Sequence, residues 1–216
     1  EREAYEAELC ATVEAEGAAL LKNENNALPL ASGAKVSLFG HGSVDLMYGG
    51  TGSGSVDTSK APNLKQALEA QGITINQTLW DLYSSDSMMS KYSRLTPASI
   101  SDTLEANTQY AVNEAPWSAL SSAESSFAEY GDAAIVVLSR SGGEGADLPS
   151  GENGTSDSWI SGQEGDGNYL ALSAEEIELL KNLKALKDNG TFKNIVVLIN
   201  SSNAIELDFL NPEICG

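Results

Sequence analysis

The chain has 216 residues, of which 41% are hydrophobic, and it carries 12 Lys plus Arg against 31 Asp plus Glu, a net charge of -19. A chain of this length is expected to form one domain, residues 1–216, with a sizeable core. The strong negative charge repels phosphate backbones and anionic lipids, which excludes nucleic-acid and membrane-surface partners. No run of about 18 apolar residues occurs, so no membrane-spanning helix is expected.

The two ends of the chain give little information about its compartment. The start, residues 1–5, lacks a charged-then-apolar signal segment, which favours a cytoplasmic chain. Cys10 and Cys215 are not in a Cys-x-x-Cys pattern, so we expect two reduced structural thiols rather than a metal or redox site. An end-to-end disulfide between them stays open as an alternative.

The first third of the chain alternates helical and extended patterns. Apolar residues at helical spacing predict an amphipathic helix over residues 3–23, which a turn at residues 25–29 ends. A short β-type run over residues 35–39 follows, and it leads into a glycine-rich loop over residues 40–59. The next predicted elements are a helix at about residues 63–71 and a strand at residues 73–75.

The remaining part repeats this alternation after a weaker stretch. Residues 79–130 predict helices and a long excursion, and residues 133–139 form a continuously apolar run typical of a buried parallel strand. A second long loop, residues 140–168, comes next. The sequence from Ser173 to Glu176 has capping-box spacing, which predicts a helix to Asn189 with Gly190 as its left-handed end.

A further apolar strand at residues 194–199 completes a pattern of strands and helices in alternation. This pattern predicts an α/β fold, a three-layer sandwich whose mostly parallel sheet is covered by helices on both faces. Such sheets bind ligands beyond the carboxyl ends of their strands, which places both glycine-rich loops at the functional edge.

The first of these loops invites a dinucleotide-binding interpretation, because Gly40-x-Gly42 follows a strand. The fingerprint needs glycine where this chain has Asp45, and a carboxylate there would repel a pyrophosphate. His41 is the single histidine, so any His-based metal site or Ser-His-Asp triad would depend on it. We interpret it as a hydrogen-bonded structural residue, and no cofactor or metal is expected.

The second loop carries a glutamate, Glu144, between Gly143 and Gly145, shortly after the buried strand. Bare backbone on both sides lets a bulky ligand approach the carboxyl group closely. A general acid needs that access and a raised pKa, which partial burial or a second carboxylate would give. A plain turn glutamate fits the spacing equally well.

Four ordered segments resemble the second domain of family 3 glycoside hydrolases. They are Glu16–Glu24 followed by Leu28-Pro29-Leu30, the strand 36–40, the loop 49–54 and the segment 141–147. The resemblance covers most of the chain. It implies a two-domain active site, in which a (β/α)8 barrel supplies an aspartate nucleophile and this α/β sandwich supplies the acid/base glutamate, here Glu144.

The resemblance also implies retaining hydrolysis of β-glucoside-like substrates, for which two carboxyl groups lie roughly 5 to 5.5 Å apart. No barrel is present in these 216 residues, so we expect the chain to be part of a larger enzyme, inactive without the barrel. The sequence of residues 48–54 is similar to that of the family subgroup in which the α/β domain precedes the barrel. The domain order in the parent enzyme stays open. The run Asp166–Leu170 is expected to shape the wall of the site, and Trp159 either stacks on a sugar or pins its own loop.

Two other functions remain as alternatives. A non-catalytic carbohydrate-binding or scaffolding module would keep the fold without needing an ionisable residue at position 144. A nucleotide-binding protein would need phosphate contacts at residues 40–45.

Overall fold

The computed structural model describes residues 2–49, 53, 57–94, 112–142 and 169–207. By its contacts the chain divides into two compact units, Glu1–Leu30 and Ala31–Gly216. The first unit contains one helix and a turn. The second contains the sheet, and with it both loops singled out in the sequence.

Helix α1, Arg2–Gly17, is shorter than the sequence predicted. It ends at Gly17 instead of Asn23, because glycine is the residue that most weakens a helix apart from proline. The apolar residues at helical spacing, Tyr5, Leu9 and Val13, are 65%, 48% and 63% exposed. Cys10 of the same helix is a free, exposed thiol, whereas Cys215 lies outside the described residues.

The predicted turn after this helix is present. Asn25 and Asn26 both adopt left-handed backbone conformations, with φ of 53° and 55°. The side chain of Asn23 donates to the carbonyl of Leu28 (2.9 Å) and accepts from its N–H (3.1 Å), which closes the turn.

The second unit is built on a parallel sheet of four strands in the order β2-β1-β3-β4. The strands are β1 Lys35–Phe39, β2 Thr74–Ile75, β3 Ala133–Arg140 and β4 Ile195–Ser201. Each lies where an apolar run predicted it, and the α/β fold class is confirmed. All eight residues of β3 are buried, as the continuous apolar run indicated.

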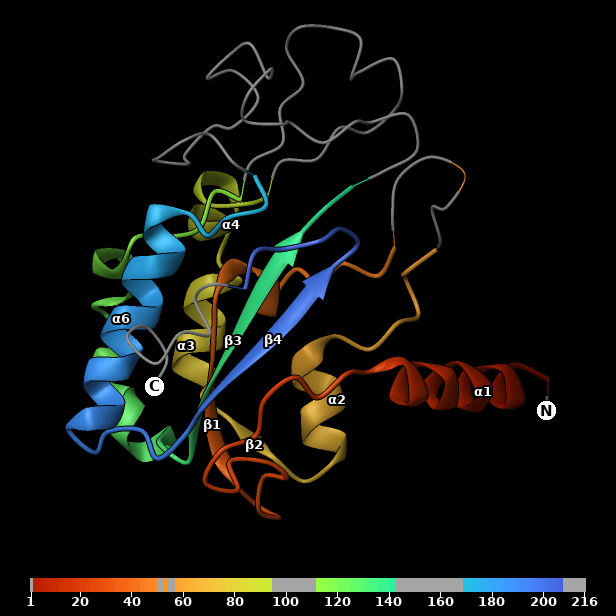
Figure 1. Ribbon diagram of the computed structural model, residues 1–216, viewed down its shortest axis with the longest axis horizontal. Coiled ribbons are helices and arrows are strands. Elements are labelled where there is room, and N and C mark those ends of the chain that lie inside the picture. Colours follow the sequence, from red (N-terminus) through yellow and green to blue (C-terminus); the bar gives the residue numbers. More distant parts are fainter. Residues whose placement is uncertain (1, 50–52, 54–56, 95–111, 143–168, 208–216) are drawn as a thin grey trace, which may run out of the picture. The chain divides into compact units, whose positions relative to one another are not determined.

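The helices cover both faces of this sheet. They are α2 Leu64–Ala70, α3 Gln77–Tyr83, α4 Asp86–Lys91 and α6 Ala174–Asp188, with 3-10 helices at His41–Ser43, Trp117–Leu120 and Glu124–Tyr130. Right-handed crossovers put α2 on one face and α3 and α6 on the other, as Figure 1 shows. The predicted capping box of α6 is present, and Gly190 has a φ of 85°.

The core beneath α3 and α6 is centred on three phenylalanines. The ring of Phe39 in β1 lies 5.2 Å from that of Phe127 and 5.7 Å from that of Phe192, both edge-on. Each of the three is 0–1% exposed. Edge-to-face aromatic packing of this kind fixes β1 against the helices and against the connection into β4.

The strand order places the two glycine-rich loops together. From β1 the chain turns to β2 on one side, and it later returns to β3 on the other side of β1. Between β1 and β3 the sheet therefore has a topological switch point, where open α/β sheets bind their ligands. The loop after β1 and the loop after β3 both start there.

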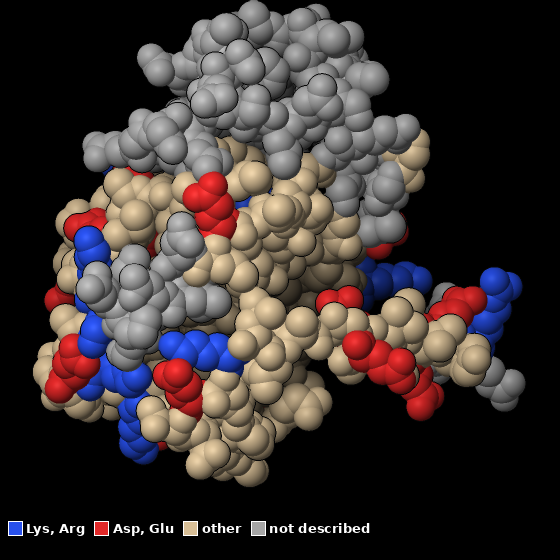
Figure 2. Space-filling model, viewed as in Figure 1, with Lys and Arg blue, Asp and Glu red and all other residues tan. Residues whose placement is uncertain are grey.

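The charged side chains on the face seen in Figure 2 are not gathered into one patch. On the face seen in Figure 2, the blue and red side chains of the described residues are interspersed. Lys184 and Asp188 of α6, for example, form an i,i+4 pair at 3.0 Å. Pairs of this exposed kind contribute little to stability.

Gly131, just before β3, should not tolerate a side chain. A Cβ there would lie 2.2 Å from the carbonyl oxygen of Thr191 and 3.2 Å from that of Ala128, both backbone atoms that cannot rotate away. Gly131→Ala should lower the free energy of unfolding by about 1–3 kcal/mol, measured by urea denaturation. Gly17→Ala is the matched control, because a Cβ there meets nothing within 4 Å. Equal unfolding midpoints for the two variants would contradict the packing described here.

Candidate active-site edge

Glycines let the first loop cross close over the end of β3. Gly40 has a φ of 83°, and a Cβ on it would lie 2.7 Å from the carbonyl oxygen of Val137. A Cβ on Gly42 would lie 2.5 Å from Ser139 Oγ. The Gly-x-Gly pattern therefore serves the close approach of two backbones at the switch point.

The first two amides of this loop are already bonded within the protein. The N–H of Gly40 donates to the hydroxyl of Tyr83 (3.2 Å), and the N–H of His41 donates to Glu114 Oε2 (2.7 Å). The helix that follows β1 is a 3-10 turn over His41–Ser43, and α2 begins only at Leu64. A pyrophosphate needs amides that point outward from a helix start, so these contacts argue against the dinucleotide interpretation.

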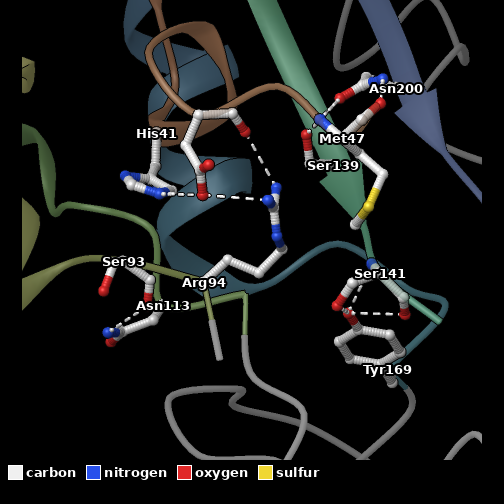
Figure 3. Close-up of polar contacts among 10 residues, drawn as sticks. His41, Met47, Ser93, Arg94, Asn113, Ser139, Ser141, Tyr169 and Asn200 are labelled. Carbon is white, nitrogen blue, oxygen red and sulfur yellow. Dashed lines mark hydrogen bonds and ion pairs between the residues drawn. The ribbon is translucent and has the colours of Figure 1, made fainter. Parts of the chain in front are cut away.

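His41, Asp45 and Arg94 form a polar cluster beside the loop (Figure 3). His41 Nε2 and Arg94 Nη2 lie 3.2 Å and 3.0 Å from Asp45 Oδ2. Burial raises the pKa of Asp45, but the hydrogen bond with His41 and the charge of Arg94 outweigh it and the pKa is lowered. The histidine is buried and hydrogen-bonded, which agrees with the structural role predicted for it.

Asn200 in β4 holds this loop against the sheet at a second point, Met47. Its side chain accepts from the N–H of Met47 and donates to the carbonyl of the same residue (2.9 Å), as strand partners do. Ser139 Oγ in β3 donates to the same Asn200 oxygen (3.3 Å). The first loop is thus fixed at two points, over β3 at Gly40 and against β4 at Met47.

The root of the second loop is held by Arg140, which ends β3 and is 0% exposed. All five of its N–H groups are used. Two pair with the carboxylate of Glu176 (2.8 and 2.7 Å), and the others donate to the carbonyls of Ser139 (2.9 Å), Tyr169 (2.8 Å) and Ala171 (2.7 Å). The guanidinium therefore joins the end of β3 to the start of α6.

The next residue, Ser141, is held by two side chains. Its N–H donates to the hydroxyl of Tyr169 (3.0 Å; Figure 3). Its carbonyl accepts from Asn203 Nδ2 (2.6 Å). A Cβ on Gly142 would lie 2.4 Å from Asn203 Oδ1, so a larger residue there would displace the Asn203 side chain. These contacts fix the chain three residues before Glu144.

The predicted catalytic residue, Glu144, lies outside the described residues, as do Trp159 and Asp166. Tyr169, the described end of the predicted wall segment, is fully buried and anchors the loop. The roles of Arg140 and Glu114 were not predicted from the sequence. The signal for Arg140 was available, since an arginine that ends a continuously apolar strand must be paired.

Among the described residues of this edge, Glu114 is the carboxyl group whose pKa is shifted most. It is 6% exposed, accepts from the N–H groups of His41 and Ala115, and lines a small cavity with Arg94, Ser139 and Glu176. Burial raises its pKa to about 7, and the negative charge of Glu176 adds to the rise, against the two hydrogen bonds.

This shift predicts a pH-dependent stability. Unfolded, Glu114 ionises near its usual pKa of about 4.3, whereas in the folded state it keeps its proton until about pH 7. Protonation of Glu114 therefore adds its full contribution to the free energy of unfolding below about pH 4. This contribution decreases as the pH rises to 7 and is lost above pH 7. Its size is on the order of 3 kcal/mol, and urea denaturation at a series of pH values measures it.

Glu114→Gln removes the titrating group at this position. The change in the pH dependence of stability then gives the contribution of Glu114 apart from that of the other carboxylates. The amide accepts from one N–H instead of two, so the variant should be less stable at pH 5 by about 1–3 kcal/mol. The difference from the unmodified chain should shrink between pH 5 and 8. Glu124→Gln, at an exposed glutamate of the 3-10 helix, is the control and should leave the slope unchanged. A Glu114→Gln difference that stays constant with pH would refute the assignment.

The described residues contain no group of three or more His, Cys, Asp or Glu side chains arranged to hold a metal ion. Within the same residues, no helix has the length and apolar character that crossing a membrane requires.

Comparisons with known proteins match this architecture. The chain is 29% identical over 223 aligned residues to Beta-glucosidase A of Butyrivibrio fibrisolvens, covering 95% of the chain and 24% of that protein. The structure of beta-glucosidase 3B from Thermotoga neapolitana in complex with glucose superposes with a TM-score of 0.64 at 24% identity, over 93% of this chain and 25% of that one. A beta-glucosidase from Paenibacillus barengoltzii gives a TM-score of 0.62 at 24% identity, over 90% of this chain and 18% of that one.

The chain thus spans about a quarter or less of the length of these relatives. Residues 18–215 match the Glycosyl hydrolase family 3 C-terminal domain, which includes every element of the sheet and both loops of the switch point. The chain therefore belongs to glycoside hydrolase family 3, as its C-terminal-type α/β domain.

Proposed function

We propose that this domain supplies the general acid/base, Glu144, of a retaining β-glucosidase whose nucleophile lies on a separate (β/α)8 barrel domain. The observation that carries the proposal is the position of Ser141 and Gly142. Both lie at the carboxyl end of β3, the central strand at the switch point, and Glu144 follows directly between two glycines.

The chemistry assigns one proton transfer in each direction to Glu144. In the first step its carboxyl proton goes to the glycosidic oxygen as that oxygen leaves, while an aspartate of the barrel bonds to the anomeric carbon. In the second step the Glu144 carboxylate takes a proton from water, whose oxygen displaces the aspartate at the anomeric carbon. Two inversions leave the anomeric configuration unchanged.

The substrate class rests on the relatives. The curated relative is named as a beta-glucosidase, and the Thermotoga protein was crystallised with glucose. A neutral sugar also suits an edge whose described cationic groups, Arg94 and Arg140, are already paired with carboxylates. We therefore propose β-glucosides as the substrates of the whole enzyme.

Glu144→Gln in the full-length enzyme tests the acid role. For alkyl β-glucosides and disaccharides, kcat/KM should fall by a factor on the order of 10² to 10⁴, because the leaving oxygen departs without a proton. For dinitrophenyl β-glucoside it should fall far less, since that leaving group needs no protonation. Azide should then raise kcat on dinitrophenyl β-glucoside and give the β-glucosyl azide, detected by NMR.

Glu164→Gln is the control, because Glu164 lies in the same loop with glycine on one side only. It should behave as the unmodified enzyme on every substrate. Equal losses for all leaving groups in Glu144→Gln, with no effect of azide, would remove the residue from this role. Retained activity on all substrates would favour a non-catalytic carbohydrate-binding module.

The 216-residue chain by itself should fold and yet hydrolyse no glycoside, because the proposed nucleophile lies outside it. A cooperative urea transition together with no release of nitrophenol from aryl β-glucosides is the expected pair of results. Enzyme-like turnover by the isolated chain, abolished by Glu144→Gln, would contradict the two-domain site. Asp147 and Asp166 would then be the first carboxylates to test as nucleophiles.

A further inference from the structure

Tyr48 in the first loop is an aromatic side chain that remains open to solvent. It is 42% exposed, whereas the other described aromatic side chains of the second unit are buried or partly buried. A single exposed tyrosine is ordinary on a protein surface, so its surroundings decide what it can do.

The ring of Tyr48 is held in place at the carboxyl edge of the sheet. Its hydroxyl donates to the carbonyl of Pro62 (2.9 Å). The preceding residue, Met47, is bound through its N–H and its carbonyl by Asn200, near the end of β4 (Figure 3). Because the backbone and the far end of the ring are both held, a ligand that covers the ring orders little that is not already ordered.

A partly exposed carboxylate accompanies this ring. Burial raises the pKa of the Tyr48 phenol, and the negative charge of nearby Asp45 raises it further. The Asp45 side chain is 38% exposed, and its Oδ2 atom faces both His41 and Arg94. Within the described part of the chain no hydrogen bond goes to Oδ1, so the carboxylate has acceptor capacity left for a ligand.

We infer that Tyr48 and Asp45 form a binding position for a neutral pyranose ring, the leaving-group sugar of the substrate. The Tyr48 ring covers the apolar C–H face of the sugar, and the Asp45 carboxylate accepts hydrogen bonds from its hydroxyl groups. A neutral ligand fits because Arg94 is already paired, and the charge of Asp45 repels an anion.

The assignment to the leaving-group sugar rests on the proposed function. A domain that protonates the departing oxygen faces the leaving-group side of the scissile bond, while the barrel holds the glucosyl unit that bonds to its nucleophile. Contacts of the kind that Tyr48 and Asp45 offer are equal in the ground state and the transition state. They should therefore change KM for a sugar leaving group more than kcat.

Tyr48→Ala in the full-length enzyme tests this position with two substrates, cellobiose and methyl β-glucoside. Both have poor leaving groups that need a proton, and in cellobiose alone the leaving group is a sugar. KM for cellobiose should rise on the order of tenfold with kcat little changed, and KM for methyl β-glucoside should rise far less. Equal rises for the two substrates, or no rise for either, would overturn the inference.

Binding of thiocellobiose, whose sulfur link resists hydrolysis, measures the same contact without chemistry. Its Kd, from isothermal titration calorimetry, should rise on the order of tenfold in Tyr48→Ala and return most of the way in Tyr48→Trp, which restores an aromatic face. Tyr130→Ala is the matched control, because Tyr130 is partly buried just before β3, at the opposite edge of the sheet. A rise in Tyr130→Ala as large as in Tyr48→Ala would contradict a local contact.

Asp45→Asn gives a second measurement should Tyr48→Ala not fold. It keeps the shape of the side chain and removes the charge of the acceptor, so the Kd of thiocellobiose should rise severalfold. An unchanged Kd in this variant would remove Asp45 from the sugar-binding position.

Glu144→Gln in the same series separates the two proposals. If Glu144→Gln depends on the leaving group as proposed while Tyr48→Ala leaves the Kd of thiocellobiose unchanged, the sugar-binding position fails and the proposed function stands. If Glu144→Gln lacks that dependence while Tyr48→Ala weakens binding, the proposed function fails. The sugar-binding position then stands without its assignment to the leaving group.

Discussion

The buried ion pair between Arg140 and Glu176 is the contact on which the functional edge depends. Both side chains are almost fully buried, so removing one partner leaves an uncompensated charge and costs about 3–5 kcal/mol. Arg140 ends β3 and Glu176 lies in the first turn of α6, so the pair joins two elements that are far apart in sequence. It also satisfies the helix cap, because Glu176 accepts the N–H of Ser173. One carboxylate thus joins the sheet, the helix and the loop between them.

Glycines and polar side chains have different roles at this edge. Gly40, Gly42 and Gly142 let the chain pass at distances that exclude a Cβ, and Asn200 and Asn203 then bind the passing backbone. The loops are held by side chains of other elements, not by regular secondary structure. Such an edge can present a functional group without moving the strands beneath it.

Much of this fold follows from local sequence. The runs that form β1 and β3 are apolar because both of their faces are covered, and the capping box of α6 is a local hydrogen-bond pattern. The end of α1 was misjudged because the apolar spacing continues past Gly17, where the backbone cost of glycine prevails. The strand order, and with it the switch point, depends on pairings between distant segments that local patterns do not contain.

The residues of the candidate site also fall into those that local sequence predicts and those that depend on distant partners. Glu144 stands out through its two glycine neighbours, a local feature. Arg140 was read as the start of a loop, because its burial depends on Glu176 and on the carbonyls of Tyr169 and Ala171, which come after the whole loop. Glu114 gave no signal, since its raised pKa comes from burial beside residues of the first loop and of β3. Partners distant in sequence account for what was missed.

The anchored ends of the loop 143–168 have a consequence for how this enzyme family can vary. Closing a chain segment costs entropy that rises with the logarithm of its length, so doubling the segment adds only about 0.6 kcal/mol. With Ser141 and Tyr169 already joined, insertions and deletions between them leave β3 and α6 in place. Residues between these anchors can therefore be exchanged, added or removed at little cost in folding.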